Sequence, residues 1–219
     1  MTPPPLVLLH GLGTGPEAWG PQRAHFEATR RVVTPASWTL DGAFATIDEV
    51  VAEAGEVDIC GLSLGGVAAL TYASSNDRVR RLVVCGAFSH LPDDVRGRVE
   101  RTSSILAIVP GAVLRRGLAS AAPKPWRSAA RRALAGVPSH TLKDTLRAVA
   151  RLDLRPRLAC VTSPTLVLCG GDDRHNLPLG RDLAAVLPDA RFAVVEGGGH
   201  VANLDAPDAF TSLVDEFLH

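Results

Sequence analysis

The chain has 219 residues, 46% of them hydrophobic and 21% charged, with 23 basic and 23 acidic side chains. This length predicts one domain, or one domain with an insertion, and the composition excludes a disordered chain. The formal net charge of zero argues against nucleic acid or an anionic membrane as a partner, and no apolar stretch approaches the roughly 18 residues of a membrane span.

We expect no signal peptide, because residues 1–5 contain neither a basic segment nor a long apolar one. The cysteines, Cys60, Cys85, Cys160 and Cys169, follow neither a zinc pattern nor a C-x-x-C redox pattern. Most of them end short apolar runs. We therefore interpret them as small buried residues of a protein in a reducing cytoplasm, and we expect no metal site.

Short apolar runs, most of them continuous rather than alternating, recur along the chain. They predict strands at residues 5–9, 31–34, 57–60, 81–85, 165–169 and 191–195. Continuous hydrophobicity is typical of strands that are covered on both faces. Helical patterns lie between them, at residues 44–51 and 67–73, from Pro178 to 188, and at 207–218. This alternation predicts an α/β protein with a mostly parallel sheet and helices on both sides.

The alternation stops between residues 88 and 159, where no strand is convincing. A helix start is predicted at Leu91–Asp94, and an apolar run at 105–114 is broken by Pro110 and Gly111. Residues 90–150 contain eleven Lys or Arg and four Asp or Glu. We interpret this segment as a helical insertion over the sheet, not as a second domain.

The segment Gly61-Leu62-Ser63-Leu64-Gly65 matches the pattern G-x-S-x-G, and it lies between a predicted strand and a predicted helix. A serine on such a sharp turn adopts strained backbone angles, and the glycines on either side lack the Cβ atoms that would clash there. The free N–H groups at the start of the following helix favour developing negative charge. Ser63 is therefore a candidate nucleophile.

Three loops at strand ends carry the other candidate residues. His10-Gly11 follows the first strand, where backbone N–H groups such as that of Leu12 can turn toward the serine; His10 itself is interpreted as structural. Asp172-Asp173 follows the strand at 165–169, and His200 follows the last strand after three glycines. Parallel strands bring such residues to one crevice at their carboxyl ends.

These motifs, in the order Ser, Asp, His, resemble those of the α/β-hydrolase superfamily. The matching segments are His10-Gly11 with Trp19, residues 61–66, Gly170-Gly171-Asp172-Asp173, and Gly199-His200 followed by Leu204 and Pro207. The resemblance implies an α/β-hydrolase core of residues 1–87 and 160–219. Residues 88–159 fall where that family inserts a helical lid, after the sixth strand of its central pattern.

The resemblance also implies a role for each candidate. Ser63 is the nucleophile, His200 is the general base, and an aspartate is its partner. The family pattern G-x-x-D, counted from Gly170, favours Asp173 over Asp172. His175, two residues past Asp173, is a less favoured rival base.

The backbone N–H groups of Leu12 and Leu64 would form the oxyanion hole, with His10, Gly11, Gly61 and Gly65 supporting these loops. Such a site uses no metal and no organic cofactor.

We therefore expect a serine hydrolase that cleaves a small carboxylic ester, lactone or thioester. The same residues support carbon–carbon hydrolysis, perhydrolysis, acyl transfer or amide cleavage, and a weakly catalytic ligand-binding receptor is the remaining alternative. The run at 105–114 is either a buried lid helix or the wall of an acyl pocket. The basic excess of the lid is either a solvated face or an attraction for anionic substrates. The sequence leaves the oligomeric state open.

Overall fold

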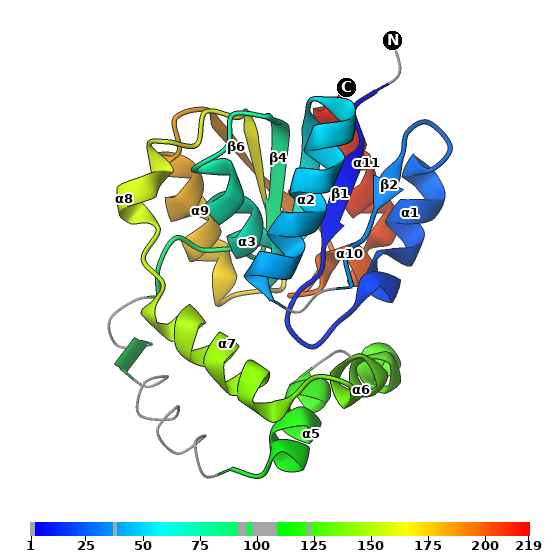
Figure 1. The fold of residues 1–219 in the computed structure, drawn as a ribbon, viewed down its shortest axis with the longest axis vertical. Coiled ribbons are helices and arrows are strands. Elements are labelled where there is room, and N and C mark those ends of the chain that lie inside the picture. Colours follow the sequence, from blue (N-terminus) through cyan, green and yellow to red (C-terminus); the bar gives the residue numbers. More distant parts are fainter. Residues whose placement is uncertain (1–2, 37–38, 92–95, 98–108, 122–123) are drawn as a thin grey trace.

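A single parallel sheet forms the centre of the computed structural model, which describes residues 3–36, 39–91, 96–97, 109–121 and 124–219 (Figure 1). Its strands are β1 (Leu6–Leu9), β2 (Val32–Val33), β3 (Val57–Leu62), β4 (Val79–Cys85), β5 (Thr165–Gly170) and β6 (Ala190–Val195). They lie in the order β2-β1-β3-β4-β5-β6, and every neighbouring pair is parallel. The predicted fold class and all the predicted strands are confirmed.

Helices cover both faces of this sheet. They are α1 (Gly20–Phe26), α2 (Leu40–Ala54), α3 (Leu64–Ala73), α9 (Asn176–Val186), α10 (Ala202–Asp205) and α11 (Pro207–Leu218), with a 3₁₀ turn η1 (Pro16–Trp19) before α1. Within β1, Val7 and Leu9 pack into the core on the side of α2, α3 and α9. Leu6 and Leu8 pack into the core on the side of α1, α10 and α11. Because both faces of β1 are buried, its successive residues are all apolar.

One predicted helix boundary is wrong. Proline is favoured at the first helical position, so Pro178 was expected to open a helix. Instead α9 begins at Asn176, because the N–H groups of Asn176 and Leu177 already donate to the carbonyl of Asp173 at 3.1 and 2.9 Å. Pro178 fits the first turn because the N–H that it lacks has no intrahelical acceptor there.

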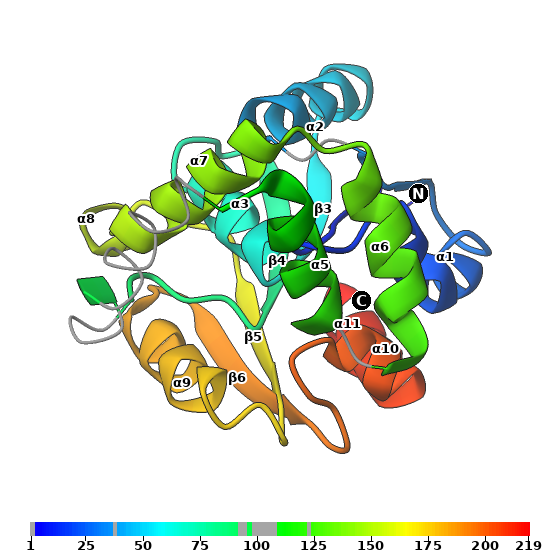
Figure 2. The ribbon, with the colours of Figure 1, turned by 90° about the horizontal axis from the view of Figure 1, so that it is seen from below.

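The described part of the segment between β4 and β5 is helical. It consists of α5 (Gly111–Ala121), the 3₁₀ turn η2 (Lys124–Trp126), α6 (Arg127–Ala135), α7 (Ser139–Arg151) and α8 (Arg155–Leu158). Helices α5, α6 and α7 lie across the carboxyl ends of the strands (Figures 1 and 2). They share an apolar cluster of their own that includes Leu114, Leu134 and Leu142. Residues 92–94 of the predicted helix start and residues 105–108 of the apolar run lie outside the described residues, whereas residues 111–114 of that run form the start of α5.

The two ends of this segment lie side by side. The N–H of Leu154 donates to the carbonyl of Ser89 at 2.7 Å, and His90 forms an antiparallel bridge with Asp153. Leu154 and Leu158 then pack into the core on the α2 side of the sheet. The chain therefore leaves the sheet and returns to it at one place.

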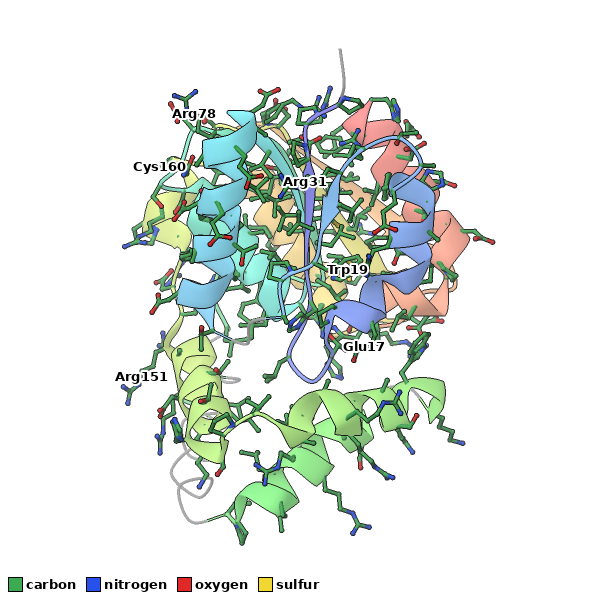
Figure 3. All side chains as sticks on the ribbon, turned by 45° about the vertical axis from the view of Figure 1, so that its right-hand side comes forward. Glu17, Trp19, Arg31, Arg78, Arg151 and Cys160 are labelled. Atoms are coloured by element: carbon green, nitrogen blue, oxygen red, sulfur yellow. The ribbon has the colours of Figure 1, made fainter. Side chains whose placement is uncertain are left out.

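The cysteines carry free thiols. Cys60, Cys85 and Cys169 are buried, whereas Cys160 is exposed at the margin of the molecule (Figure 3). Burial, with a further contribution from Asp173, raises the pKa of the Cys169 thiol to about 11. In the described residues we find no helix with the length and apolar character needed to cross a membrane.

A buried charge cluster joins the segment between α1 and β2 and the end of α11 to the sheet. Asp58 of β3 is fully buried and accepts a hydrogen bond from the buried Arg30 at 2.7 Å. Arg80 of β4 donates to the same carboxylate at 2.9 Å and to the carbonyl of Leu218 at 3.0 Å. Loss of Asp58 would leave the Arg30 guanidinium buried without a counter-charge.

We therefore expect Asp58→Ala to lower the free energy of unfolding by about 3–5 kcal/mol, the usual cost of removing one partner from a buried ion pair. Urea denaturation measures this loss. The matched control is Glu27→Ala, which breaks an exposed pair with Arg23 and should cost less than about 1 kcal/mol. Similar losses in the two variants would contradict the assignment of Asp58 as a stabilising centre.

Candidate active site

Ser63 lies on the sharp turn between β3 and α3. Its φ is +53°, and among the described residues no other non-glycine residue has a positive φ. A Cβ atom on Gly61 would lie 2.3 Å from the carbonyl oxygen of Gly65, and one on Gly65 would lie 2.1 Å from the carbonyl oxygen of Leu9. Both contacts are shorter than any side chain tolerates. The glycines therefore allow the start of α3 to pack on β1 and β3 while the turn projects Ser63 from the sheet.

The loop after β6 packs against the turn after β5 in a similar way. A Cβ atom on Gly170 would lie 2.2 Å from the carbonyl oxygen of Gly199. The N–H of Asp172 donates to the carbonyl of Gly198 at 2.9 Å. These backbone contacts hold the turn that carries Asp173 beside the loop that carries His200.

The structure brings Ser63, His200 and Asp173 into one hydrogen-bonded chain. Nε2 of His200 lies 3.0 Å from Oγ of Ser63, and Nδ1 lies 2.7 Å from Oδ2 of Asp173. The Asp173 side chain is only 7% exposed, whereas the His200 side chain is 48% exposed. The imidazole therefore bridges a buried carboxylate and a hydroxyl that solvent and small molecules can reach.

Gly86, just after β4, supports one side of the His200 ring. Its φ is +60°, and a Cβ atom there would lie 3.3 Å from Cε1 and 3.4 Å from Nδ1 of His200. A larger residue at this position would strain the backbone and displace the ring. No local pattern singles out Gly86, because this contact joins positions far apart in the chain.

Asn176 was also missed by the sequence analysis. Its side-chain nitrogen lies 3.0 and 2.9 Å from the two carboxylate oxygens of Asp173. Burial alone would raise the pKa of Asp173, but hydrogen bonds from His200 and Asn176 and the charge of His200 outweigh it, so the pKa lies below its usual value. Asp173 is therefore held as a carboxylate. The only local signal was its place two residues before Pro178, where the helix was predicted to start.

The loop after β1 lies directly against the serine turn. A Cβ atom on Gly11 would be 3.2 Å from the carbonyl oxygen of Leu62 and 3.3 Å from Cβ of Ser63. Leu12 follows in this loop, and Leu64 is the first residue of α3. The N–H of Leu64 belongs to the first turn of the helix, where N–H groups have no intrahelical acceptor.

The remaining candidates occupy different places. His10 is buried, and its Nδ1 lies 3.1 Å from the carbonyl oxygen of the next residue. The side chains of Asp172 and His175 are exposed. Of the two aspartates, Asp173 lies within hydrogen-bond distance of His200.

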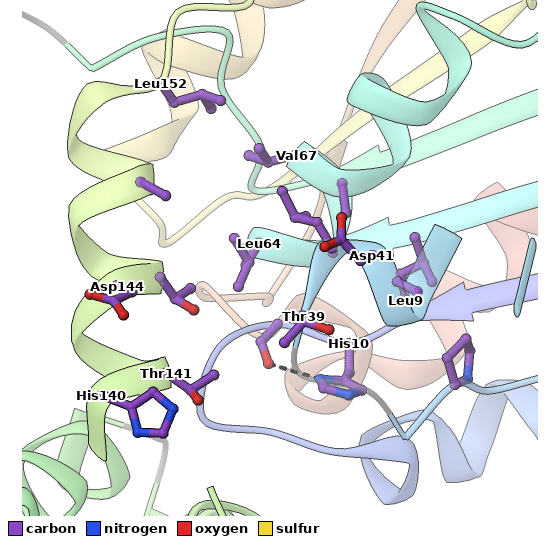
Figure 4. Close-up of a pocket in the computed structure, with 18 residues that line it drawn as sticks. Leu9, His10, Thr39, Asp41, Leu64, Val67, His140, Thr141, Asp144 and Leu152 are labelled. Atoms are coloured by element: carbon purple, nitrogen blue, oxygen red, sulfur yellow. Dashed lines mark hydrogen bonds between the residues drawn. The ribbon is translucent and has the colours of Figure 1, made fainter. Parts of the chain in front are cut away.

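A cavity of about 440 Å³ opens beside the serine turn, between α7 and the sheet (Figure 4). Its walls are Leu9, His10, Gly11, Pro35, Thr39, Leu40, Asp41, Ala43, Leu64, Gly65, Val67, Ala68, His140, Thr141, Asp144, Thr145, Ala148 and Leu152. Most of these side chains are apolar or small, and none of the described lining residues is Lys or Arg. No group of three or more metal-ligating side chains was found among the described residues.

This arrangement has the elements of nucleophilic catalysis. The imidazole can accept the Ser63 proton at Nε2 while its Nδ1–H donates to Asp173, which selects the tautomer and stabilises the imidazolium that forms. The N–H groups beside Ser63 can stabilise an oxyanion.

Comparisons with known proteins agree with this fold. The model of the alpha/beta hydrolase family matches residues 6–213. A pimeloyl-[acyl-carrier protein] methyl ester esterase of Aromatoleum aromaticum is 30% identical over 100% of this chain and 99% of its own length. A putative carbamate hydrolase of Serratia proteamaculans is 30% identical over 96% of this chain and 89% of its own.

Solved structures are similar throughout the chain. The enol-lactonase from Burkholderia xenovorans LB400 superposes with a TM-score of 0.81 at 22% identity, covering 100% of this chain and 92% of that one. A hydrolase from Pseudomonas aeruginosa PA01 superposes with a TM-score of 0.81 at 24% identity, covering 99% of this chain and 90% of that one. These likenesses show the fold, and the family match with the 30% identical relatives shows the family. The chain is an enzyme of the alpha/beta hydrolase family.

Proposed function

We propose that this enzyme hydrolyses small carboxylic esters, including lactones and thioesters, with Ser63 as nucleophile, His200 as general base and Asp173 as its partner. The observation that carries the proposal is the continuous hydrogen-bonded chain, with Oγ to Nε2 at 3.0 Å and Nδ1 to Oδ2 at 2.7 Å. The methyl ester esterase, matched over the whole chain, supports an ester as the bond that is cleaved.

In the proposed mechanism, Oγ of Ser63 attacks the carbonyl carbon of the ester and its proton passes to Nε2 of His200. The carbonyl oxygen becomes an oxyanion that accepts hydrogen bonds from the N–H groups of Leu12 and Leu64. The carbon–oxygen bond to the leaving alcohol then breaks, and the alcohol takes the proton from His200. Water attacks the acyl-enzyme with His200 again as base, which releases the acid and restores Ser63.

The proposal includes residues 88–159 as a lid over a core formed by residues 1–87 and 160–219. The hydrogen bond between Ser89 and Leu154 supports these limits, as does the separate apolar cluster of α5, α6 and α7. The cavity beneath α7 would receive the apolar part of the substrate. Because none of its described lining residues is cationic, we favour an uncharged acyl or alkyl group over an anionic one.

Carbamate cleavage is a second candidate, because a relative that is 30% identical is named a putative carbamate hydrolase. The same residues can perform it, since the nucleophile would attack a carbonyl carbon in either case. A substrate panel that pairs esters with carbamates of the same alcohol separates the two activities.

Ser63→Ala should lower ester hydrolysis by roughly 10⁶-fold while the protein stays folded, because the nucleophile is removed. A fluorophosphonate should label the wild-type protein once, at Ser63, and should not label the variant. Mass spectrometry locates the label, and thermal unfolding checks the fold. Full turnover by the variant would contradict the assignment of Ser63 as the nucleophile. A wild-type protein that takes no label and has no turnover would favour a ligand-binding receptor.

Asp173→Asn should remove stability in a pH-dependent way. The pKa of Asp173 is lower in the folded protein than its usual value, so the unfolded chain binds more protons in mild acid. The stability that ionised Asp173 contributes is therefore present above its unfolded pKa of about 3.9 and is lost as the pH falls through its folded pKa.

Urea denaturation at a series of pH values from 7 downward should thus show a difference in the free energy of unfolding between wild type and Asp173→Asn. This difference should vanish in acid. The matched control is Asp172→Asn, at an exposed neighbouring carboxylate, which should unfold like the wild type throughout. A gap that persists unchanged at the lowest pH would contradict the role of the carboxylate charge.

Ala148→Phe should shorten the preferred acyl chain, because Ala148 of α7 lines the cavity beside the serine turn. Esters with short acyl groups should keep their rate, while kcat/KM for long ones falls by tenfold or more, about the effect of 1.4 kcal/mol. The control is Ala112→Phe, at an exposed position on α5 outside this cavity. Equal chain-length profiles for all three proteins would contradict the proposed acyl site.

A further inference from the structure

The side chain of Asn176 lies against both of the groups that act on Ser63. Its Nδ2 lies 3.0 Å from Oδ1 and 2.9 Å from Oδ2 of Asp173, and 3.2 Å from Nδ1 of His200. The start of α9 does not need this amide, because the carbonyl of Asp173 already accepts the N–H groups of Asn176 and Leu177. The side-chain contacts therefore serve something other than the helix.

The surroundings determine which end of the amide faces the carboxylate. Both Asp173 oxygens are acceptors, and Oδ2 also accepts the Nδ1–H of His200. An amide oxygen in this place would lie against two acceptor oxygens at 3.0 and 2.9 Å, with Nδ1 of His200 farther away at 3.2 Å, whereas an amide nitrogen donates to both oxygens. Side-chain donors of Asn176 and His200, together with the backbone N–H of Asn176 at 3.4 Å from Oδ1, thus converge on one buried carboxylate.

The contact to both oxygens restricts rotation of the carboxylate. Without it, Oδ1 would keep the longer hydrogen bond of 3.4 Å from the backbone N–H of Asn176, which holds one oxygen only and leaves the group freer to turn about its Cβ–Cγ bond. The hydrogen bond from Asn176 also contributes to the low pKa of Asp173, after burial and the interactions with His200. Both effects favour the arrangement in which Nδ1 of His200 carries the proton and Nε2 is free to accept one.

We propose that Asn176 is a positioning residue, which fixes the plane of the Asp173 carboxylate so that Oδ2 stays aimed at Nδ1 of His200. The inference rests on the proposed serine-hydrolase function. Asn176 touches no substrate in this role. It acts on the rate through the orientation of the imidazole, so its loss should change kcat and leave KM unchanged.

The test is Asn176→Leu, which keeps the approximate volume, excludes water and removes the donor. Hydrogen bonds to charged groups are worth about 1.5–3 kcal/mol, so kcat should fall by roughly tenfold or more while KM stays constant. Asn176→Ser supplies one shorter donor and should have an intermediate kcat. The kcat values of both variants are divided by the fraction of folded protein, which thermal unfolding measures.

The matched control is Asn76→Leu. Asn76 is another half-buried asparagine, which donates to the hydroxyl of Tyr72 at 2.8 Å, outside the site. This variant should lose some stability and keep the wild-type kcat. If Asn176→Leu does not fold, Asn176→Ser alone still decides, because a single short hydroxyl cannot span both carboxylate oxygens.

Fluorophosphonate labelling separates the two ways in which this idea can fail. A wild-type enzyme labelled at Ser63, with folded Asn176 variants that keep the wild-type kcat and labelling rate, would overturn the positioning role and leave the proposed function standing. A wild-type protein that is never labelled at Ser63 would overturn the proposed function, and the positioning role with it. A lower kcat and slower labelling, with partial recovery in Asn176→Ser, would support it.

Discussion

Close packing of backbone on backbone at the end of β3 is the constraint on which the rest of the site depends. Ser63 holds a positive φ because Gly61 and Gly65 allow the start of α3 to touch both its own strand and β1. Strain of this kind costs about 1–3 kcal/mol and persists only where the surroundings enforce it. Here the packing of the sheet, which is buried on both faces, holds the turn in this conformation. The loop after β1 contacts the serine turn from the other side.

Close backbone packing also brings Asp173 and His200 to the serine. Gly170 lets the turn after β5 approach the carbonyl of Gly199 more closely than a side chain would permit, so Asp173 and His200 meet although they lie 27 positions apart in the chain. Gly86 leaves room for the imidazole on its other flank. The reacting groups thus project from a rigid edge whose precision comes from glycine contacts, while α5, α6 and α7 form the surroundings in which a substrate would sit.

Much of this could be predicted from the sequence, because the signals are local. Continuous apolar runs predict every strand, and glycines beside Ser63 and before His200 mark the functional turns. The start of α9 was misplaced because proline is tolerated throughout a first turn, not only at its first position. Asn176 and Gly86 escaped notice because their importance comes from contacts with His200, which only the assembled sheet creates.

The hydrogen bond between Ser89 and Leu154 separates the α5–α7 segment from the sheet. One hydrogen bond joins the two ends of the segment that contains α5–α7. The sheet therefore already holds the two ends of this long loop together. The entropy of closing such a loop rises only slowly with its length. Replacing the α5–α7 segment by one of another length or shape would therefore leave the strand register untouched, so the surroundings of the cavity can change while the sheet stays the same.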